Sequence, residues 1–569
     1  MAQYPAGMHR RRFLIGAAAA GGAAALGMEG KAFADDPIIP AESTASTAGL
    51  TTNSIGAISV TQADQQYPDM VRALNARYTA APESVRVVDA PAQVAPIVTE
   101  AVRAGKRLTI RSGGHCLEDF VYNSETQIVL DVSKMNGVYY HSGTNAIAVE
   151  SGATLLDVYE KLYSAWGVTI PGGICYSVGM GGHVAGGGWG MLVRRNGLVV
   201  DHLYAVEVVT VAADGTVKTI VATREAADPN RELWWAHTGG GGGNFGVVTR
   251  YFFRSPGATG TDPRQLLPKP PAEVLFSAVS WAWSDLTKDE FVQLAQNYAS
   301  WHVANIGADS PTRFLTSFLL LNHKSNGQIG LVTQVDANAP NAQQMLDDYL
   351  AHMNQGVNVV QGALTEPMGE MSALPHFASP RRMPWLQATR FAGTTNPLLN
   401  DPTLRAEYKS AYMKANFPRA HAETMYKYLT STAIDNPKVN IQLTPYGGRV
   451  TALGDTDTAV SHRGSAFKIL WSVLWNDASE DAKHIAWTRE SYEETYADTG
   501  GVPVPNTVTD GCYINYPDAD LNDPLRNRSA VPWHDLYYKG NYPRLQQAKK
   551  KYDPKNFFRH SQSVRLPAA

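Results

Sequence analysis

The stretch PGGICYSVGMGGHVAGGGWG, residues 171–190, places the thiol of Cys175 inside a run of glycines. A second loop upstream, RSGGHC at residues 111–116, places the imidazole of His115 in the same kind of setting. Glycine lets the backbone turn through positive φ and approach a ligand closely, and successive N–H groups around one hollow form a nest for a diphosphate. We therefore predict that both loops face one bound cofactor and that His115 and Cys175 each bond to it covalently.

The same glycines do not complete the other common nucleotide-binding motifs. The dinucleotide fingerprint G-x-G-x-x-G begins at Gly179 and Gly181, but Val184 occupies the place of its third glycine. A P-loop is excluded because neither Gly30-Lys31 nor Gly105-Lys106 is followed by Ser or Thr. Taken singly, His115 could instead be a loop histidine bonded to backbone, and Cys175 an inert apolar residue.

Three later stretches accompany the two loops: GGGGGNFGVV (239–248), GCYINYPD (511–518) and YDPKNFFRHSQSV (552–564). In this order they resemble the berberine bridge enzyme family of FAD-linked oxidases, within the vanillyl-alcohol oxidase superfamily. The chain is most similar to the oligosaccharide and antibiotic-sugar oxidases of that family, which hold FAD by two bonds. The resemblance runs from about Tyr78 to the end. It implies an 8α-histidyl bond through His115 and a 6-S-cysteinyl bond through Cys175.

The resemblance also implies the other cofactor contacts. They are Arg111, Ser112, Gly113, Gly114, Cys116, Gly173, Val178, Gly179, Gly181, Gly182, His183, Gly186, Gly187, Gly190, Gly243, Asn244, Gly246, Val247, Val248, Tyr513 and Asn556. Val178 stands where plant members of the family use a small valine to admit oxygen. We therefore expect an oxidase that reduces molecular oxygen to hydrogen peroxide.

The resemblance implies that substrate gives a hydride to flavin N5 and that Tyr516 acts as the base or helps it. The alternation of residues 513–517 predicts a strand with Tyr513, Asn515 and Pro517 on one face and Tyr516 on the other. A phenol, with a pKa of about 10, is a poor base unless a neighbour stabilises the phenolate. Gln442 and Tyr446, in QLTPYGG, are the candidates for that second residue; each tyrosine could also be a core aromatic.

The expected substrate is an alcohol or hemiacetal of a sugar or glycosylated metabolite, because the two-bond relatives act on such molecules. A flavoenzyme of secondary metabolism that performs oxidative cyclisation or amine oxidation is the nearer alternative. A metal-binding or hydrolytic protein using His115, His183 and Cys175 is less favoured, because their spacing fits no short metal signature and no G-x-S-x-G elbow precedes a helix. A flavin carrier without catalysis is the third alternative.

Length and composition predict two large domains in a packed globular protein. The chain has 569 residues, of which 44% are hydrophobic and 18% charged. Its net charge of −3 implies no general attraction to nucleic acid or to anionic lipid. We predict an α+β fold: a PCMH-type FAD-binding domain at 78–256, an antiparallel-sheet substrate domain with helices on one face at 257–505, and a C-terminal segment at 506–569 that returns to the FAD-binding domain.

The first residues resemble a twin-arginine export signal. Arg10-Arg11-Arg12-Phe13-Leu14 precedes an Ala/Gly-rich run that is too short and glycine-rich for a membrane span, and Ala32-Phe33-Ala34 fits a cleavage site. We expect a signal at residues 1–34, a poorly ordered linker at 35–77 and export of the folded, FAD-loaded protein from a bacterium. Three cysteines do not make a disulfide framework, although Cys116 and Cys512 could pair or stay buried.

Overall fold

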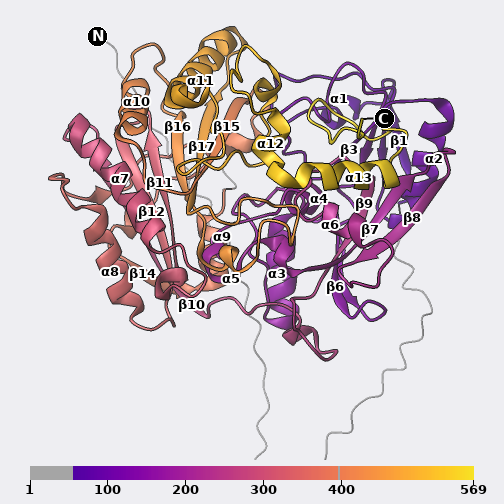
Figure 1. The fold of residues 1–569 in the computed structure, drawn as a ribbon, viewed down its shortest axis with the longest axis horizontal. Coiled ribbons are helices and arrows are strands. Elements are labelled where there is room, and N and C mark those ends of the chain that lie inside the picture. The colour runs from indigo at the N-terminus through magenta and orange to yellow at the C-terminus, as the bar shows by residue number, and fades with distance from the viewer. Residues whose placement is uncertain (1–54, 395–396, 569) are drawn as a thin grey trace, which may run out of the picture. The chain divides into compact units, whose positions relative to one another are not determined.

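The computed structural model describes residues 55–394 and 397–568, which form three β-sheets and the helices packed on them (Figure 1). The α+β fold predicted from the sequence is confirmed: two sheets lie almost wholly in the part of the chain predicted to bind FAD, and the third is the predicted antiparallel sheet with helices on one face. The predicted signal at residues 1–34 lies outside the described residues. No helix among the described residues has the length and apolar character needed to cross a membrane.

The first sheet positions the histidine loop. Its strands, in spatial order, are β1 (Ile58–Thr61), β2 (Ser84–Val87), β4 (Ile128–Asp131) and β3 (Leu108–Arg111). β2, β4 and β3 are parallel, and the amphipathic helix α2 (Val94–Ala104) connects β2 to β3. The loop that carries His115 therefore leaves the sheet from the carboxyl end of β3.

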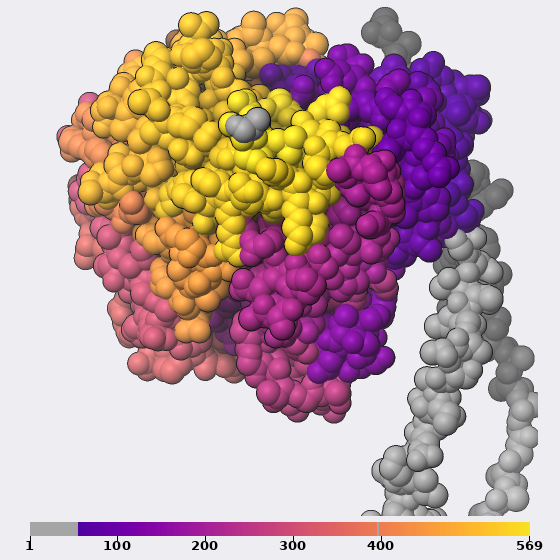
Figure 2. All heavy atoms as spheres, turned by 45° about the vertical axis from the view of Figure 1, so that its right-hand side comes forward, coloured from indigo at the N-terminus to yellow at the C-terminus, as the bar shows by residue number. Residues whose placement is uncertain are grey.

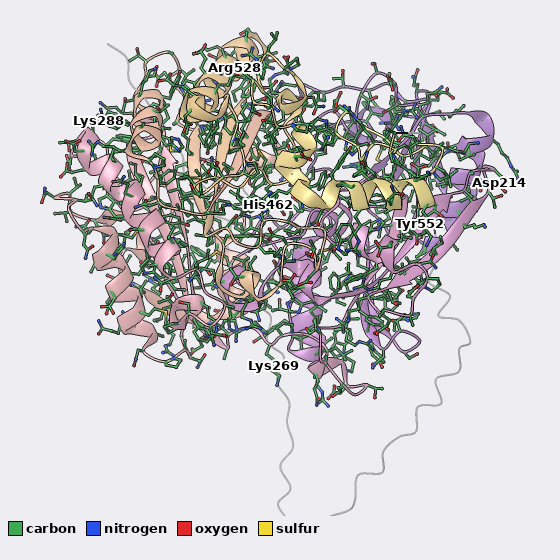
Figure 3. All side chains as sticks on the ribbon, viewed as in Figure 1. Asp214, Lys269, Lys288, His462, Arg528 and Tyr552 are labelled. Atoms are coloured by element: carbon green, nitrogen blue, oxygen red, sulfur yellow. The ribbon has the colours of Figure 1, made fainter. Side chains whose placement is uncertain are left out.

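The second sheet is antiparallel and lies beside the cysteine loop. Its order is β5 (Val138–His141), β6 (Ala146–Glu150), β9 (Val247–Phe253), β7 (Leu203–Val211) and β8 (Val217–Thr223). β7 and β8 form a hairpin: Asp214, labelled in Figure 3, lies in the turn between them and Gly215 adopts φ 87°. The cysteine loop joins helix α3 (Leu155–Trp166) to helix α4 (Met180–Ala185).

The third sheet has eight antiparallel strands. They are β13 (Gly362–Ala363), β10 (Glu273–Ala282), β12 (Gln328–Asp336), β11 (Leu315–Asn322), β16 (Asn440–Pro445), β17 (Phe467–Trp475) and β15 (Arg405–Met413), with β14 (Arg381–Pro384) on β10. One face is covered by α7 (Lys288–Ala304), α8 (Ala342–Met353), α10 (Arg419–Leu429) and α11 (Asp481–Thr495), as Figure 1 shows.

The register of this sheet aligns one row of side chains on the face turned away from those helices. Leu320 pairs with Gln442, Gln442 with Leu470, and Leu470 with Ser410. Because side chains alternate along a strand, Phe318 and Tyr408 lie on the same face as their neighbours two residues away. We call Phe318, Leu320, Tyr408, Gln442 and Leu470 the roof.

The C-terminal segment lies against the FAD-binding part. Helices α12 (Trp533–Tyr538) and α13 (Tyr542–Tyr552), yellow in Figure 2, lie beside the magenta residues that include α6 (Arg231–Ala236). Arg544 pairs with Glu232 at 2.7 Å, and the buried Lys549 donates to the carbonyl of Asn244 at 2.6 Å. Asn244, in the predicted cofactor stretch, is therefore held by this segment.

One expectation about the amino-terminal part is wrong. Residues 55–77, which belong to the range predicted as a poorly ordered linker, contain β1 and the short helix α1 (Tyr67–Met70). β1 pairs with β2, and Val60 is buried with Val85 and Val129 in one apolar cluster. Although its Ala/Ser/Thr-rich composition suggested a linker, the segment contains enough apolar residues to form an edge strand.

The remaining short helices are α5 (Val193–Asn196) and α9 (Trp385–Ala392).

Candidate active site

The two glycine loops touch each other through their glycines. A Cβ on Gly113 would lie 2.2 Å from the backbone nitrogen of Gly179 and 2.5 Å from the carbonyl oxygen of Ser177. Only a residue without a side chain allows this approach. His115 Nε2 then lies 2.8 Å from Ser177 Oγ, so a hydrogen bond also joins the loops. We call the two loops, residues 111–116 and 171–190, the floor.

The floor brings the predicted nucleophiles together. Cys175 Sγ lies 4.0 Å from His115 Nδ1, and both side chains line one cavity. Burial, with a smaller contribution from the charge of Arg111, lowers the pKa of His115 to about 4. The imidazole is therefore neutral, and nucleophilic, at neutral pH. Burial raises the pKa of Cys175, and the neighbouring Glu370 adds to this effect.

The cavity between floor and roof has a volume of about 380 Å³ and a wall of backbone on the floor side. Within the described residues, the N–H groups of Gly113, Gly114 and His115 donate no hydrogen bond. A Cβ on Gly182 or Gly242 would meet no heavy atom within 4 Å. A diphosphate requires free N–H groups in succession, and a flat ring system requires open space above glycine. These residues therefore fit FAD.

Most of the residues predicted to contact the cofactor line this cavity. Besides His115 and Cys175 they are Arg111, Ser112, Gly113, Gly114, Cys116, Gly173, Val178, Gly179, Gly181, Gly182, His183, Gly190, Gly243, Asn244, Gly246, Val247, Val248 and Tyr513. Tyr516 and Gln442, two of the three predicted catalytic residues, line it as well. The structure thus places them together, while their individual roles stay predictions. Cys116 and Cys512 are both free thiols.

Four predicted residues lie outside the cavity wall. Gly186 packs against Asn515, whose Oδ1 would lie 2.1 Å from a Cβ there, and Gly187 adopts φ 110° against Val460. Asn556 occupies a left-handed turn with φ 51°, where its N–H donates to the carbonyl of Asp553. These three positions shape the backbone around the site rather than contacting a ligand in the cavity.

Tyr446 is the fourth residue outside the cavity. It is completely buried behind the site, with its ring 5.2 Å from that of Tyr412. Burial raises its pKa well above the usual value for tyrosine. The geometry therefore favours the core-aromatic alternative for Tyr446 and leaves Gln442 as the predicted residue of this strand that faces the cavity.

The prediction that residues 513–517 form a strand is wrong. The N–H of Tyr516 donates to the carbonyl of Tyr513 at 2.9 Å, so the segment turns. The two rings, 5.1 Å apart and nearly perpendicular, consequently both line the cavity instead of facing opposite ways. Five residues with an alternating pattern fit a turn as well as a strand. This described segment is not paired with a neighbouring strand that would hold it extended.

Glu370 and Tyr408 are cavity residues that the sequence did not indicate. They belong to a loop and to β15, 38 residues apart, and the hydroxyl of Tyr408 donates a hydrogen bond to the carboxylate of Glu370. Burial raises the pKa of Glu370. No local motif marks either residue, because only the folded sheet brings the loop over β15.

Lys468 is a third residue that the sequence analysis missed, and it lies under the cavity wall. Its Nζ lies 3.2 Å from the ring centre of Trp189 and 4.6 Å from that of Tyr513. It is buried, and within the described residues its amine has no hydrogen-bond partner. Burial lowers its pKa well below the ordinary value for lysine. A lysine inside the apolar strand FKILWSVLW is the sequence signal that could have found it.

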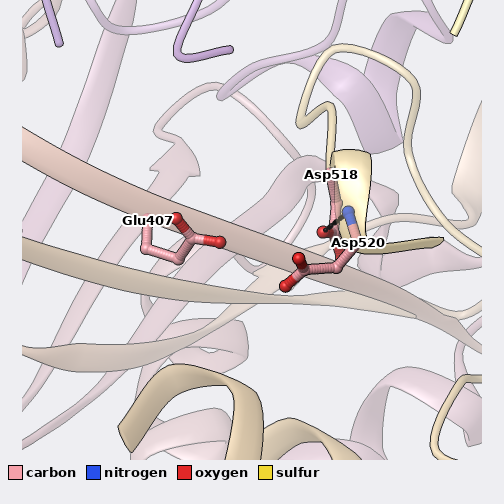
Figure 4. Close-up of side chains that lie close together, drawn as sticks. All are labelled: Glu407, Asp518 and Asp520. Carbon is pink, nitrogen blue, oxygen red and sulfur yellow. Dashed lines mark hydrogen bonds between the residues drawn. The ribbon is translucent and has the colours of Figure 1, made fainter. Parts of the chain in front are cut away.

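Three carboxylates, Glu407, Asp518 and Asp520, form the one cluster with metal-ligand spacing among the described residues (Figure 4). Lys409 Nζ lies 2.8 Å from both aspartates. Arg489 pairs with Asp520, and Arg77 with Glu407. These lysine and arginine side chains neutralise the three carboxylates. The resulting ion pairs hold β15 against the segment that carries Tyr516.

Two family models match the chain: FAD binding domain over residues 82–220, and Berberine and berberine like over residues 512–565. The chain is 45% identical over 560 residues to aclacinomycin-N/aclacinomycin-A oxidase of Streptomyces galilaeus, covering 98% of both chains. It is 30% identical to hexose oxidase of Chondrus crispus, covering 88% of this chain and 93% of the relative.

Among solved structures, the fold is similar to CrmK, a flavoenzyme of caerulomycin biosynthesis, with a TM-score of 0.85 and 44% identity. The match covers 90% of this chain and all of the other. The FAD binding domain and the named oxidase relatives show that the chain is an FAD-linked oxidoreductase acting on CH–OH groups. The chain belongs to the berberine bridge enzyme-like family of FAD-linked oxidases.

Proposed function

We propose that this protein is an exported oxidase with FAD bound through both His115 and Cys175. It oxidises an alcohol or hemiacetal of a sugar-bearing metabolite and reduces molecular oxygen to hydrogen peroxide. The observation that carries the proposal is the 4.0 Å separation of Cys175 Sγ and His115 Nδ1 on the wall of one glycine-lined cavity. Two nucleophiles so placed can reach two carbons at the same end of one flat ligand.

The hydrogen bonds of the floor favour one atom of His115 for the bond. Nε2 is engaged by Ser177 Oγ at 2.8 Å, whereas Nδ1 faces Cys175. Nδ1 is therefore the nitrogen available to the 8α carbon. The thiol of Cys175 would bond to ring carbon C6, and both bonds together would fix the flavin while leaving the roof side open to a large substrate.

When bound, FAD supplies the hydride acceptor, its ring nitrogen N5, and returns the electrons to oxygen. The chain's own residues orient the alcohol. Burial raises the pKa of Tyr516 well above 10, and Tyr513, Glu370 and Cys175, negative when ionised, add to that effect. Tyr516 thus remains a phenol at neutral pH and is suited to donate a hydrogen bond to the substrate oxygen.

The residues that line the roof favour a substrate with an apolar part. Phe318, Leu320 and Leu470 line it, together with Met368 and Met371 from a neighbouring loop. Ligand sites combine such surfaces with a few polar groups that fix orientation. A glycosylated, partly apolar metabolite fits this lining, as the names of the antibiotic oxidases among the relatives also suggest. Val178, on the cavity wall, is the proposed residue that admits oxygen.

The test is oxygen consumption and peroxide formation by the purified protein with aclacinomycin A, and with glucose as the free-sugar comparison. We expect turnover of aclacinomycin A with one peroxide per oxygen, and weak turnover of glucose. Oxidation of amines or ring closure of an alkaloid, with no alcohol oxidised, would favour the secondary-metabolism alternative. A protein without bound flavin would refute the proposal.

Export through a twin-arginine signal is the remaining part of the proposal. Residues 10–14 carry the arginine pair followed by Phe and Leu. Replacing Arg10 and Arg11, the pair that one spacer residue separates from Phe13 and Leu14, with Lys should keep the flavin-loaded protein inside the producing cell. Undiminished export of that variant would contradict this route.

A further inference from the structure

Glu370 and Tyr408 form a hydrogen-bonded acid–phenol pair inside the cavity. The hydroxyl of Tyr408 donates to the Glu370 carboxylate, and both side chains line the cavity wall. Tyr408 is buried, while Glu370 keeps part of its surface open to the cavity. A carboxylate is an acceptor only, so the pair has one defined direction for proton movement: from the phenol to the carboxylate.

The pair stands close to the thiol that would hold the flavin. Tyr408, Tyr516 and Cys175 pack in one apolar cluster with Leu470, and the rings of Tyr408 and Tyr516 are 6.0 Å apart. Ring carbon C6, the proposed partner of Cys175, is next to the carbon that bears N5. A flavin held by Cys175 would therefore bring this edge of its ring toward the cluster that contains Tyr408.

Tyr516 alone makes a poor proton acceptor in these surroundings. The groups whose charges act on it, Tyr513, Glu370 and Cys175, would each be negative when ionised. A second phenolate among them would be repelled rather than stabilised. Glu370, in contrast, is a carboxyl group that is ionised at neutral pH in its ordinary state, and a general base works best with a pKa near the working pH.

We propose that Glu370, acting through Tyr408, is the proton acceptor of the alcohol oxidation; the inference rests on the proposed function and deepens it. The substrate hydroxyl gives its proton to the oxygen of Tyr408, whose own proton passes to Glu370. With FAD bound, the cofactor would accept the hydrogen and its electron pair from the substrate carbon, which would leave a carbonyl group. The proton on Glu370 later leaves with the peroxide. Tyr408 contacts the substrate, and Glu370 is the positioning residue and proton store behind it.

The pH dependence follows from the groups that face Glu370. They include Tyr408 on β15, Tyr516 on the C-terminal segment and Cys175 on the floor. Burial raises the pKa of each of these three groups, so they are uncharged near neutral pH and Glu370 is the member of this set that titrates. Burial raises its pKa above the ordinary glutamate value, and flavin reduction should therefore rise with pH through that raised value.

The experiment compares Glu370→Gln and Tyr408→Phe with the wild-type holoenzyme and with Glu366→Gln, an exposed carboxylate four residues away. The first readout needs no substrate: the visible flavin spectrum is titrated from acid pH upward, stopping below the alkaline range in which the flavin's own N3–H ionises. We expect one titration step in the wild type, Tyr408→Phe and Glu366→Gln, and its absence from Glu370→Gln. Acid-stable colour in every variant shows that the flavin is attached and the protein folded.

The second readout is the rate of flavin reduction by aclacinomycin A without oxygen. We expect both pair variants to be slower by about 10²- to 10⁴-fold, the usual contribution of a general base, with Glu366→Gln unchanged. The pH dependence of the rate should vanish in Glu370→Gln. Rates within threefold of wild type, or an unchanged titration in Glu370→Gln, would overturn the inference. A wild type that binds flavin but is never reduced would instead refute the proposed function, and the titration would still decide the role of Glu370.

Discussion

The floor and the roof differ in what they are built from and in what they would bind. The floor is backbone and glycine: Gly113 and Gly179 touch, and free N–H groups face the cavity. The roof is side chains from β11, β15, β16 and β17, aligned by strand register, with Glu370 beside them. A backbone surface suits a cofactor that is the same in every turnover, whereas a side-chain surface suits the substrate and its proton.

The largest effect is expected from removing both floor nucleophiles. His115→Ala or Cys175→Ala alone should keep the yellow colour through acid precipitation, because the other bond remains. The double variant should release all of its flavin. Absorbance of the precipitate and supernatant measures this. Colour lost in both single variants would show that the two bonds do not form independently.

Gly113→Ala disrupts the contact between the two floor loops and leaves His115 and Cys175 unchanged. The new Cβ would lie 2.2 Å from the backbone nitrogen of Gly179, and backbone cannot move aside cheaply. We expect the free energy of unfolding to fall by about 3 kcal/mol. Urea denaturation followed by tryptophan fluorescence measures it. The matched control is Gly182→Ala, where a Cβ meets nothing within 4 Å; an equal loss there would contradict the steric explanation.

Tyr516→Phe tests the roof side. A hydrogen-bond donor to the substrate oxygen is worth about 10²- to 10³-fold in rate when charge develops on that oxygen. We expect flavin reduction by aclacinomycin A to slow by this factor while its pH dependence stays as in the wild type. If the pH dependence disappeared in Tyr516→Phe, Tyr516 and not Glu370 would be the titrating base.

Lys468→Met tests the stability cost of the buried amine where floor and roof meet. Burial lowers the pKa of Lys468 in the folded protein, so below pH 10.5 the unfolded chain binds the extra proton and is favoured. Removing the amine should raise the free energy of unfolding at pH 7 by about 1–3 kcal/mol. The gain should shrink as the pH approaches 10.5. Urea curves at several pH values measure it, with the exposed Lys324→Met as control; a gain independent of pH would contradict this account.

The floor could be predicted from the sequence because its signals are local. The glycines, His115 and Cys175 stand in continuous stretches, and helix α3 begins and ends at local signals, the Thr154–Asp157 capping box and Gly167. The same holds for the β7–β8 hairpin.

The roof could be predicted only in part, because strand pairing creates it. β15 escaped prediction since Glu407 and Lys409 look like surface residues, yet they are buried in ion pairs with Arg77, Asp518 and Asp520. Glu370 and Tyr408 meet across 38 residues of sequence. The turn at Tyr513–Tyr516 needed a tertiary contact to distinguish it from a strand.

The central claim is that one flavin joins His115 to Cys175. Its most direct test is the mass of the acid-denatured wild-type protein followed by peptide mapping. The account predicts the added mass of one FAD and a digest in which the peptides containing His115 and Cys175 are joined through a single flavin. Flavin released by acid, or found on only one of the two peptides, would contradict the claim.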